Sequence, residues 1–258
     1  MAKKLIVANW KMNFTTGQAS VFLHKLEKLV APHRNIEIVL CPTSLALQSL
    51  SLQVDHRQFH LGAQNCYYQD EGAFTGEISA TMLRGLVHYI IVGHSERRHL
   101  FGERDKDIAH KVQAVLRNDI QPILCIGETQ QERVDGETKQ VIHDQVIGGL
   151  TNVSSDEIEK TVIAYEPVWA IGTGDFAKPD AVAEAVSLIR AQIKSLFGAE
   201  AAQKVRILYG GSVDARNSET YLQIPGIDGL LVGGASLKAP VFSKIVDSAH
   251  AVIAKKTV

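Results

Sequence analysis

Short apolar segments rich in β-branched residues alternate with longer segments along the whole chain. Most of the short segments are continuously apolar rather than alternately apolar and polar, which is typical of parallel strands that are covered on both faces. They lie at residues 5–8, 36–40, 59–63, 89–92, 122–126, 162–165, 205–208 and 229–232. The pattern therefore predicts a parallel sheet of eight strands.

The intervening segments carry helix signals. Ser154 and Glu157 have the spacing of a capping box ahead of Ile158. Pro179 suits the first position of a helix that continues through residues 181–197, and the next residue, Gly198, predicts its end. Because no linker, low-complexity segment or change of composition divides the chain, we expect a single domain over residues 1–258.

Eight strands alternating with helices fit either a closed barrel or a doubly wound open sheet. In a closed barrel the carboxyl ends of the strands share one rim, whereas an open sheet spreads them along an edge. Polar residues and glycines follow these predicted strand ends, namely Asn9, Lys11, Gln64, Asn65, His94, Ser95, Glu96, Glu166, Gly210, Gly211, Ser212, Gly233 and Gly234. Their convergence favours a closed (β/α)8 barrel, with parallel strands inside a ring of helices.

Paired glycines follow the last two predicted strands, at residues 210–211 and 233–234. A single pair is more often a tight turn than a binding site. Glycine nevertheless lets main-chain N–H groups approach a phosphate closely, and barrels often bind phosphate with the loops after strands seven and eight. Two pairs at these positions predict a small phosphorylated substrate.

Three side chains at the predicted rim are candidates for chemistry. Lys11 could be a solvated surface lysine, but its place beside anion-binding loops favours an electrostatic role. His94 could be structural, yet it stands where a strand gives way to a helix, with Ser95 as a candidate cap. A helix N-terminus favours a neutral imidazole, which can donate a hydrogen bond to a carbonyl oxygen. Glu166 could be either a buried salt-bridge partner or a base.

Residues 167–177 form a segment of small and apolar residues that is longer and less polar than an ordinary connection. Because it follows Glu166 directly and has Gly172 and Gly174 near one end, we predict that it is a lid. The sequence Gly172-Thr173-Gly174 lacks the third glycine of a dinucleotide-binding fingerprint, so we expect no dinucleotide.

The composition of the chain limits the classes of partner that the protein is expected to bind. Lys+Arg 27 against Asp+Glu 28, without a charged block, argues against nucleic acid. Cys41, Cys66 and Cys125 lack the spacing of a disulfide framework or a zinc site. Cys125 is expected in the core. The His56/His60 pair lacks the sequence context of a metal-binding motif. No stretch approaches the ~20 apolar residues of a membrane span, and no signal peptide is apparent. We therefore expect a cytoplasmic protein without metal or membrane contact.

The residues at the predicted rim resemble the triosephosphate isomerase family. The resembling segments span nearly the whole chain in the family's order, while helices such as residues 199–204 and 249–258 carry no recognisable pattern. The segments are residues 8–13, 62–65, 72–77, 92–98, 125–128, 165–174, 209–213 and 231–237.

The resemblance implies interconversion of dihydroxyacetone phosphate and glyceraldehyde 3-phosphate through an enediolate, with no metal or organic cofactor. It makes Glu166 the base that removes the proton next to the carbonyl, and neutral His94 the group that polarises the carbonyl oxygen. It places Asn9 and Lys11 against the substrate. For the phosphate it implies Gly172, Ser212, Gly233 and Gly234. Glu96 and Gln64 are implied to support the site. The residues implied for the lid are Pro167, Val168, Trp169, Ala170, Ile171, Gly172, Thr173 and Gly174.

In this family a loop that corresponds to Phe74 and Thr75 inserts into a neighbouring subunit, so the resemblance implies a homodimer; the residues alone also fit a self-packed surface loop. Another phosphate-binding barrel isomerase or epimerase would share the glycine pairs but not the whole set of polar residues. A catalytically silent barrel scaffold would be expected to have lost Lys11, His94 or Glu166, and all three are present.

Overall fold

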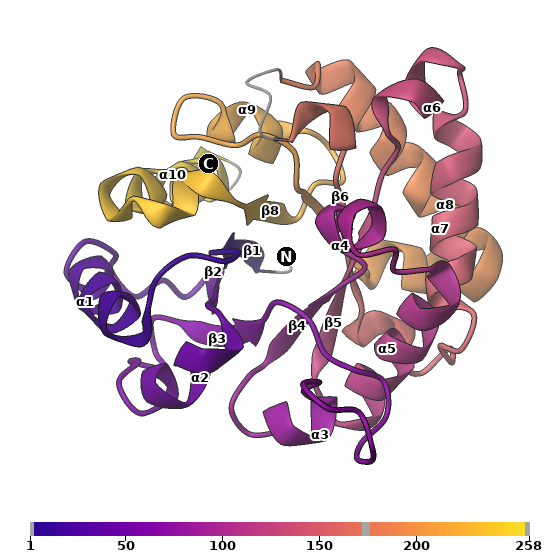
Figure 1. Ribbon diagram of the computed structural model, residues 1–258. Coiled ribbons are helices and arrows are strands. Elements are labelled where there is room, and N and C mark those ends of the chain that lie inside the picture. Colours follow the sequence, from indigo (N-terminus) through magenta and orange to yellow (C-terminus); the bar gives the residue numbers. More distant parts are fainter. Residues whose placement is uncertain (1–2, 172–175, 256–258) are drawn as a thin grey trace.

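Eight parallel strands close into a barrel in which neighbours follow chain order (Figure 1). The computed structural model describes residues 3–171 and 176–255. The predicted fold class is confirmed, and each predicted strand end lies within one residue of the observed end. The strands are β1 (Lys4–Asn9), β2 (Ile36–Cys41), β3 (His60–Ala63), β4 (Tyr89–Val92), β5 (Gln121–Ile126), β6 (Val162–Tyr165), β7 (Arg206–Tyr209) and β8 (Gly229–Val232).

Helices surround the barrel and cover the outer face of its strands (Figure 1). The α-helices are α1 (Thr16–Glu27), α2 (Ser44–Ser51), α3 (Ala80–Leu83), α4 (Ser95–Leu100), α5 (Asp105–Arg117), α6 (Gln130–Val134), α7 (Thr138–Leu150), α8 (Pro179–Lys204), α9 (Ser218–Gln223) and α10 (Ala239–Lys255). Three short 3₁₀ helices, η1 (Ile158–Lys160), η2 (Val168–Ala170) and η3 (Gly234–Leu237), lie in the connections.

The strand side chains alternate between two separate apolar clusters. Leu5 and Val7 of β1 belong to a smaller cluster inside the barrel, whereas Ile6 packs in the larger cluster between strands and helices. Successive side chains of a strand point to opposite faces. The next inward position after Val7 is therefore Asn9, and the same alternation along β6 leads to Glu166 at the carboxyl end of the barrel interior.

The helix signals are confirmed in one place and only partly in another. Pro179 begins α8, and the helix is interrupted at Gly198, which has φ = +89°, a conformation that favours glycine. Ser154 N–H and Oγ–H both donate to the Glu157 carboxylate, at 3.0 and 2.7 Å. Half of the predicted capping box is therefore formed, but it lies in the turn before η1, and no side chain caps that 3₁₀ helix.

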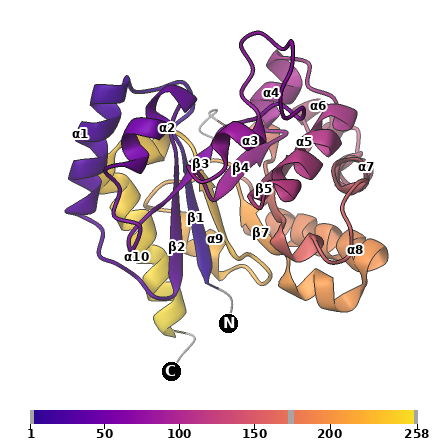
Figure 2. The same ribbon diagram turned by 90° about the horizontal axis from the view of Figure 1, so that it is seen from below.

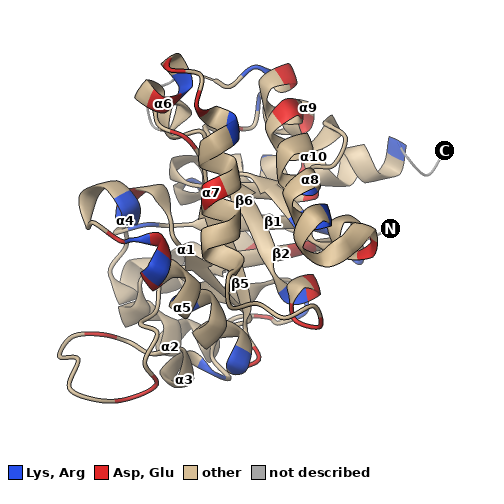
Figure 3. Cartoon of the chain, turned by 90° about the vertical axis from the view of Figure 1, so that its right-hand side faces the viewer, with Lys and Arg blue, Asp and Glu red and all other residues tan. Residues whose placement is uncertain are grey.

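The segment between β3 and α3 projects from the body of the molecule (Figure 2). It contains Phe74, which is 39% exposed and whose ring centroid lies 4.6 Å from that of Tyr67. On the side shown in Figure 3, acidic and basic residues are interspersed along the outer helices. Within the described ranges, no helix is long and apolar enough to cross a membrane.

Candidate active site

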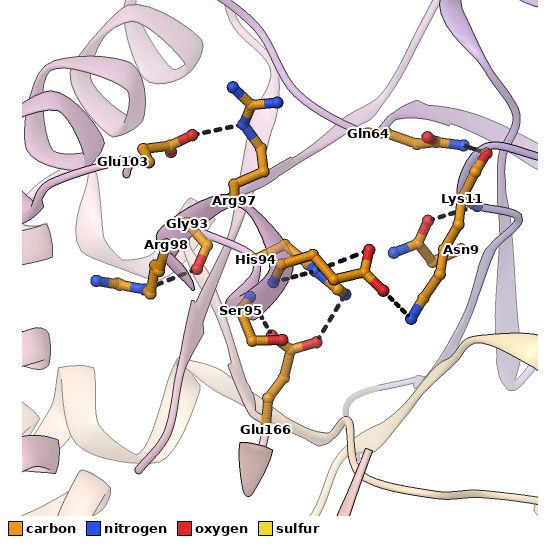
Figure 4. Close-up of polar contacts among 11 residues, drawn as sticks. Asn9, Lys11, Gln64, Gly93, His94, Ser95, Arg97, Arg98, Glu103 and Glu166 are labelled. Atoms are coloured by element: carbon orange, nitrogen blue, oxygen red, sulfur yellow. Dashed lines mark hydrogen bonds and ion pairs between the residues drawn. The ribbon is translucent and has the colours of Figure 1, made fainter. Parts of the chain in front are cut away.

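The structure brings His94 and Glu166 together at the carboxyl end of the barrel, although 72 positions separate them in the sequence (Figure 4). The Nε2 atom of His94 lies 3.1 Å from Oε1 of Glu166. The other carboxylate oxygen of Glu166 accepts a hydrogen bond of 3.1 Å from the Ser95 main-chain N–H. His94 is 6% exposed and Glu166 is 2% exposed, so the pair is shielded from bulk water.

His94 caps α4 with its own ring. Its Nδ1 atom accepts a hydrogen bond of 3.2 Å from the Glu96 main-chain N–H. Sequence reasoning had assigned the cap to Ser95, but Ser95 is the first helical residue and its N–H is used by Glu166 instead. Because Nδ1 accepts a hydrogen bond here, the neutral ring carries its hydrogen on Nε2, which faces Glu166.

Lys11 adopts φ = +53°, a left-handed conformation that is uncommon for residues other than glycine. Two of the predicted site residues hold this backbone. Asn9 Oδ1 accepts from the Lys11 N–H at 3.0 Å, and Gln64 Nε2 donates to the carbonyl oxygens of Lys11 and Cys41 at 2.8 and 2.9 Å. The Lys11 ammonium group pairs with Glu96 Oε1 at 2.5 Å. The ammonium group of Lys11 is thus directed at Glu96, whose other carboxylate oxygen lies 3.7 Å from Nδ1 of His94.

A cavity of about 370 Å³ opens above these groups. Its wall combines the polar residues with apolar side chains and with glycines of the last two strand–helix loops: Asn9, Lys11, His94, Glu166, Ile171, Phe176, Gly210, Gly211, Ser212, Leu231, Gly233 and Gly234 are among the residues that border it. The two predicted glycine pairs are therefore brought to the same cavity as Lys11, His94 and Glu166.

Ser212 is engaged with the start of the predicted lid. Its main-chain N–H and its hydroxyl both donate to the carbonyl oxygen of Ala170, at 3.1 and 2.5 Å. A phosphate that took the Ser212 N–H would have to replace this bond. Pro167, Val168, Trp169, Ala170 and Ile171 are described, with the 3₁₀ helix η2 among them, whereas Gly172, Thr173 and Gly174 lie outside the described residues.

Glu128 is a residue of this region to which sequence reasoning gave no role. It is fully buried and accepts hydrogen bonds from the Tyr165 hydroxyl at 3.0 Å and from Trp169 Nε1 at 2.9 Å, while Arg133 lies 3.3 Å away. Burial and the negative charge of Glu128 raise the pKa of Tyr165, which keeps its hydroxyl a donor. The position of Glu128 beyond the end of β5 was the available signal, since every strand end reaches the same rim.

Cys125 lies in the barrel interior and is 1% exposed, as predicted. Burial, and then the charge of Glu166, raise the pKa of this thiol well above its usual value. A thiol that stays protonated is a poor nucleophile. Cys41 and Cys66 are also free and buried.

Comparison with known proteins agrees with this geometry. The sequence model of the triosephosphate isomerase family matches residues 4–249. The chain is also 44% identical to the triosephosphate isomerase of Chloroherpeton thalassium, over 97% of this chain and all of that protein. It is 47% identical to that of Endomicrobium trichonymphae and 45% identical to that of Carboxydothermus hydrogenoformans, in both cases over 95% of this chain and 98% of the relative.

This chain belongs to the triosephosphate isomerase family. It is an isomerase with the barrel fold of that family, as the rim motifs indicated.

Five of the eight strand ends of this triosephosphate isomerase family member supply the following residues of the cavity. Asn9 and Lys11 follow β1, His94 follows β4, Glu166 follows β6, and the glycine pairs follow β7 and β8. Only closure of the barrel places all of these at one cavity.

Proposed function

We propose that Glu166, His94, Lys11 and Asn9 carry out the interconversion of dihydroxyacetone phosphate and glyceraldehyde 3-phosphate in the 370 Å³ cavity. The observation that supports this most directly is the arrangement of a shielded carboxylate and the Nε2–H of a histidine, 3.1 Å apart and beside a lysine. A base and a hydrogen-bond donor on the same side of a cavity suit proton transfer next to a carbonyl.

In the proposed reaction the Glu166 carboxylate takes a proton from the carbon next to the carbonyl. The electron pair of that C–H bond moves to the carbonyl oxygen, where the Nε2–H of His94 and the charge of Lys11 stabilise the enediolate. His94 moves a proton between the two enediolate oxygens, and protonated Glu166 returns its proton to the neighbouring carbon. Before the first step the Glu166 carboxylate has to leave the Ser95 N–H, to which it is hydrogen-bonded.

The phosphate of the substrate is assigned to main-chain N–H groups of Ser212, Gly233 and Gly234, which border the same cavity. A Cβ at position 233 would lie 3.3 Å from Cε of Lys11, a close contact that this flexible side chain would have to relieve by a small shift. Gly172 belongs to the same proposal from the family resemblance. Glu96 and Gln64 support the site through their contacts with Lys11.

A second copy of this chain is the proposed partner. A cavity of about 450 Å³ lies on the other side of Lys11 and His94, and the strongly exposed Met12 and Phe101 border it. The projecting loop with Phe74 and Thr75 would fill this cavity in the other subunit. Light scattering at micromolar concentration is expected to give twice the mass of the 28.2 kDa chain, and a monomeric mass would remove this proposal. A single catalytic domain over residues 1–258 and a cytoplasmic location also remain predictions.

The proposed base is tested by a coupled assay of glyceraldehyde 3-phosphate isomerisation. Glu166→Ala is expected to lower kcat by at least ~10²-fold, the range for a general base. Glu159→Ala, which removes an exposed carboxylate paired with Lys204, is the control and should keep full activity. Unchanged turnover in Glu166→Ala would exclude its role as the base, and no turnover of the folded unmutated chain would exclude the substrate.

A further inference from the structure

The main chain of Gly127 occupies an unusual position just beyond the end of β5. On either side of it, the pairing with the β6 side continues: Glu166 N–H donates to Ile126 O at 2.7 Å, and Val168 N–H donates to Glu128 O at 3.0 Å. Since hydrogen-bonding groups of successive residues in an extended chain point to opposite sides, the N–H and C=O of Gly127 face away from Glu166. Within residues 3–171 and 176–255, no main-chain group bonds to either of them.

The side chain of Gln145 bonds to both of these groups. Gln145 lies on α7, which packs outside β5 in the helical ring (Figure 1). Its Oε1 accepts from the Gly127 N–H at 2.7 Å, and its Nε2 donates to the Gly127 carbonyl at 3.3 Å. A carboxamide has one acceptor and one donor side, so it matches the two main-chain groups of a single residue.

Gly127 also touches the residue that carries the proposed base. A Cβ built on Gly127 would lie 1.8 Å from the carbonyl oxygen of Glu166 and 2.5 Å from its carbonyl carbon. No side chain fits in this space, so the position requires glycine. Glycine, however, restricts its own φ and ψ less than any other residue.

The N–H of Gly127 belongs to one peptide plane and its C=O to the next, so Gln145 restrains the planes on both sides of the Cα. That Cα faces the Glu166 main chain, and any rotation of either plane would move the surface against which Glu166 rests. The Glu166 side chain in turn has to reach the substrate from a position bonded to Ser95 and His94.

We propose that Gln145 is a positioning residue for Glu166, acting through the main chain of Gly127. Gln145 borders neither of the two cavities at the rim, so it has no direct contact with substrate. The inference rests on the proposed role of Glu166 as the base. It assigns to a helix outside the barrel the task of fixing the backbone beneath a catalytic carboxylate.

The test compares Gln145→Leu, which removes both hydrogen bonds, with Gln145→Glu, which keeps the acceptor for the Gly127 N–H. Misplacing a reacting group by about 1 Å can cost up to ~10²-fold in rate, so Gln145→Leu is expected to lower kcat by about tenfold or more. Its KM, and the inhibition constant of inorganic phosphate, should stay within about twofold, because the phosphate loops do not touch Gly127. Gln145→Glu restores the bond to the Gly127 N–H but places a carboxylate oxygen against the Gly127 carbonyl, so it is expected to recover only part of the lost kcat.

Gln192→Leu is the matched control. Gln192 is a half-buried glutamine on the neighbouring α8, and its Oε1 lies 2.9 Å from Nδ1 of His143, away from the rim. A merely structural loss lowers the thermal midpoint in both leucine variants, but only Gln145→Leu should lower kcat of the folded protein. If Gln145→Leu does not fold, Gln145→Asn replaces it, since the shorter amide does not span the distance to Gly127.

Three outcomes would overturn the proposal: wild-type kcat in folded Gln145→Leu or Gln145→Asn, equal losses in Gln192→Leu, or a phosphate inhibition constant that changes as much as kcat. Failure of the isomerase assignment looks different, because the unmutated chain would then be inactive. Failure of Glu166 as the base is also distinct, because Glu166→Ala would then remain active.

Discussion

The two ends of the barrel both carry charged side chains on inward-facing positions, but they use them differently. At the amino end, Glu37 accepts hydrogen bonds from the Tyr89 hydroxyl at 2.7 Å and from Arg206 Nη1 at 2.8 Å. Arg206 Nη2 donates to Tyr89 at 2.7 Å and to Gln121 at 3.1 Å. Four strands thus meet in one network in which each charge faces its partner.

At the carboxyl end, the charged groups border a cavity and do not have a full set of polar partners among themselves. Glu166 contacts His94 and the Ser95 N–H at the edge of this cavity, and Lys11 is held in a left-handed conformation. A group kept available for substrate forgoes stabilising contacts, and a strained backbone adds to that cost. The comparison teaches that the amino end stabilises the barrel and the carboxyl end is reserved for chemistry.

The largest expected effect comes from Lys11→Gly at the carboxyl end. Removing one charge that stabilises the enediolate should lower kcat by about 10²–10³-fold. Glycine tolerates the left-handed backbone, which costs other residues about 1–2 kcal/mol, so the free energy of unfolding should not fall despite the loss of the bond to Glu96. Enzyme assays and urea unfolding measure the two quantities.

Asp119→Gly is the control for Lys11→Gly. Asp119 has φ = +58° in a turn far from the rim, so this variant should keep its activity. A Lys11→Gly protein that keeps its activity but loses stability would reverse the comparison between the two ends.

Arg206→Met is the corresponding change at the amino end. It leaves the largely buried Glu37 carboxylate without its cation, and breaking such a pair typically costs about 3–5 kcal/mol. The turnover number should stay close to that of the unmutated chain. Urea unfolding and the isomerase assay test this together, and the double variant Glu37→Leu/Arg206→Met should lose less stability than Arg206→Met alone. A loss of turnover without a loss of stability would contradict the assignment.

The smallest expected effect concerns pH and the histidines beside this network. His60 and His88 have ring centroids 4.3 Å apart at the amino end. Burial is the largest cause and lowers the pKa of both rings. His56 lowers both pKa values further, Lys3 adds to the lowering at His60, and His60 adds to it at His88. The Glu37 charge acts in the opposite direction on both. Each folded-state pKa therefore lies below the unfolded value of 6.5.

The unfolded chain consequently takes up protons first as the pH falls through about 6.5, and stability present above that pH is lost below it. The urea midpoint should decline between pH 7.5 and pH 5.5, and His60→Gln should flatten the decline. His24→Gln on α1, a well-exposed histidine, should leave the pH dependence as it is. An equally steep decline in His60→Gln would show that the amino-end histidines do not contribute.

The strand positions could be predicted from sequence because strands buried on both faces are continuous apolar segments. The rim residues could be predicted for a similar reason, since each follows a strand and parallel strands in a barrel end together. Asn9, His94 and Glu166 needed no knowledge of contacts to be placed near one another. The family motifs added the reaction and the role of each residue.

Local signals alone did not decide between competing hydrogen-bond partners. Ser95 is a common type of cap, yet the helix begins one residue earlier than a Ser95 cap would place it, because the N–H groups of Arg97 and Arg98 bond to the His94 carbonyl, and the His94 ring takes the cap position. Ser154 and Glu157 form half of a capping box, but only a short 3₁₀ helix follows before β6.

The sequence by itself determined the alternation of strands and helices, and with it the barrel and the ring of chemically active residues at one end. Only the tertiary structure decided which groups meet: Gln145 with Gly127, Gly127 with Glu166, and Arg206 with Glu37. The physical reason is that apolar periodicity is written along the chain, whereas a hydrogen bond between distant residues depends on distances of a few ångströms that closure of the barrel sets.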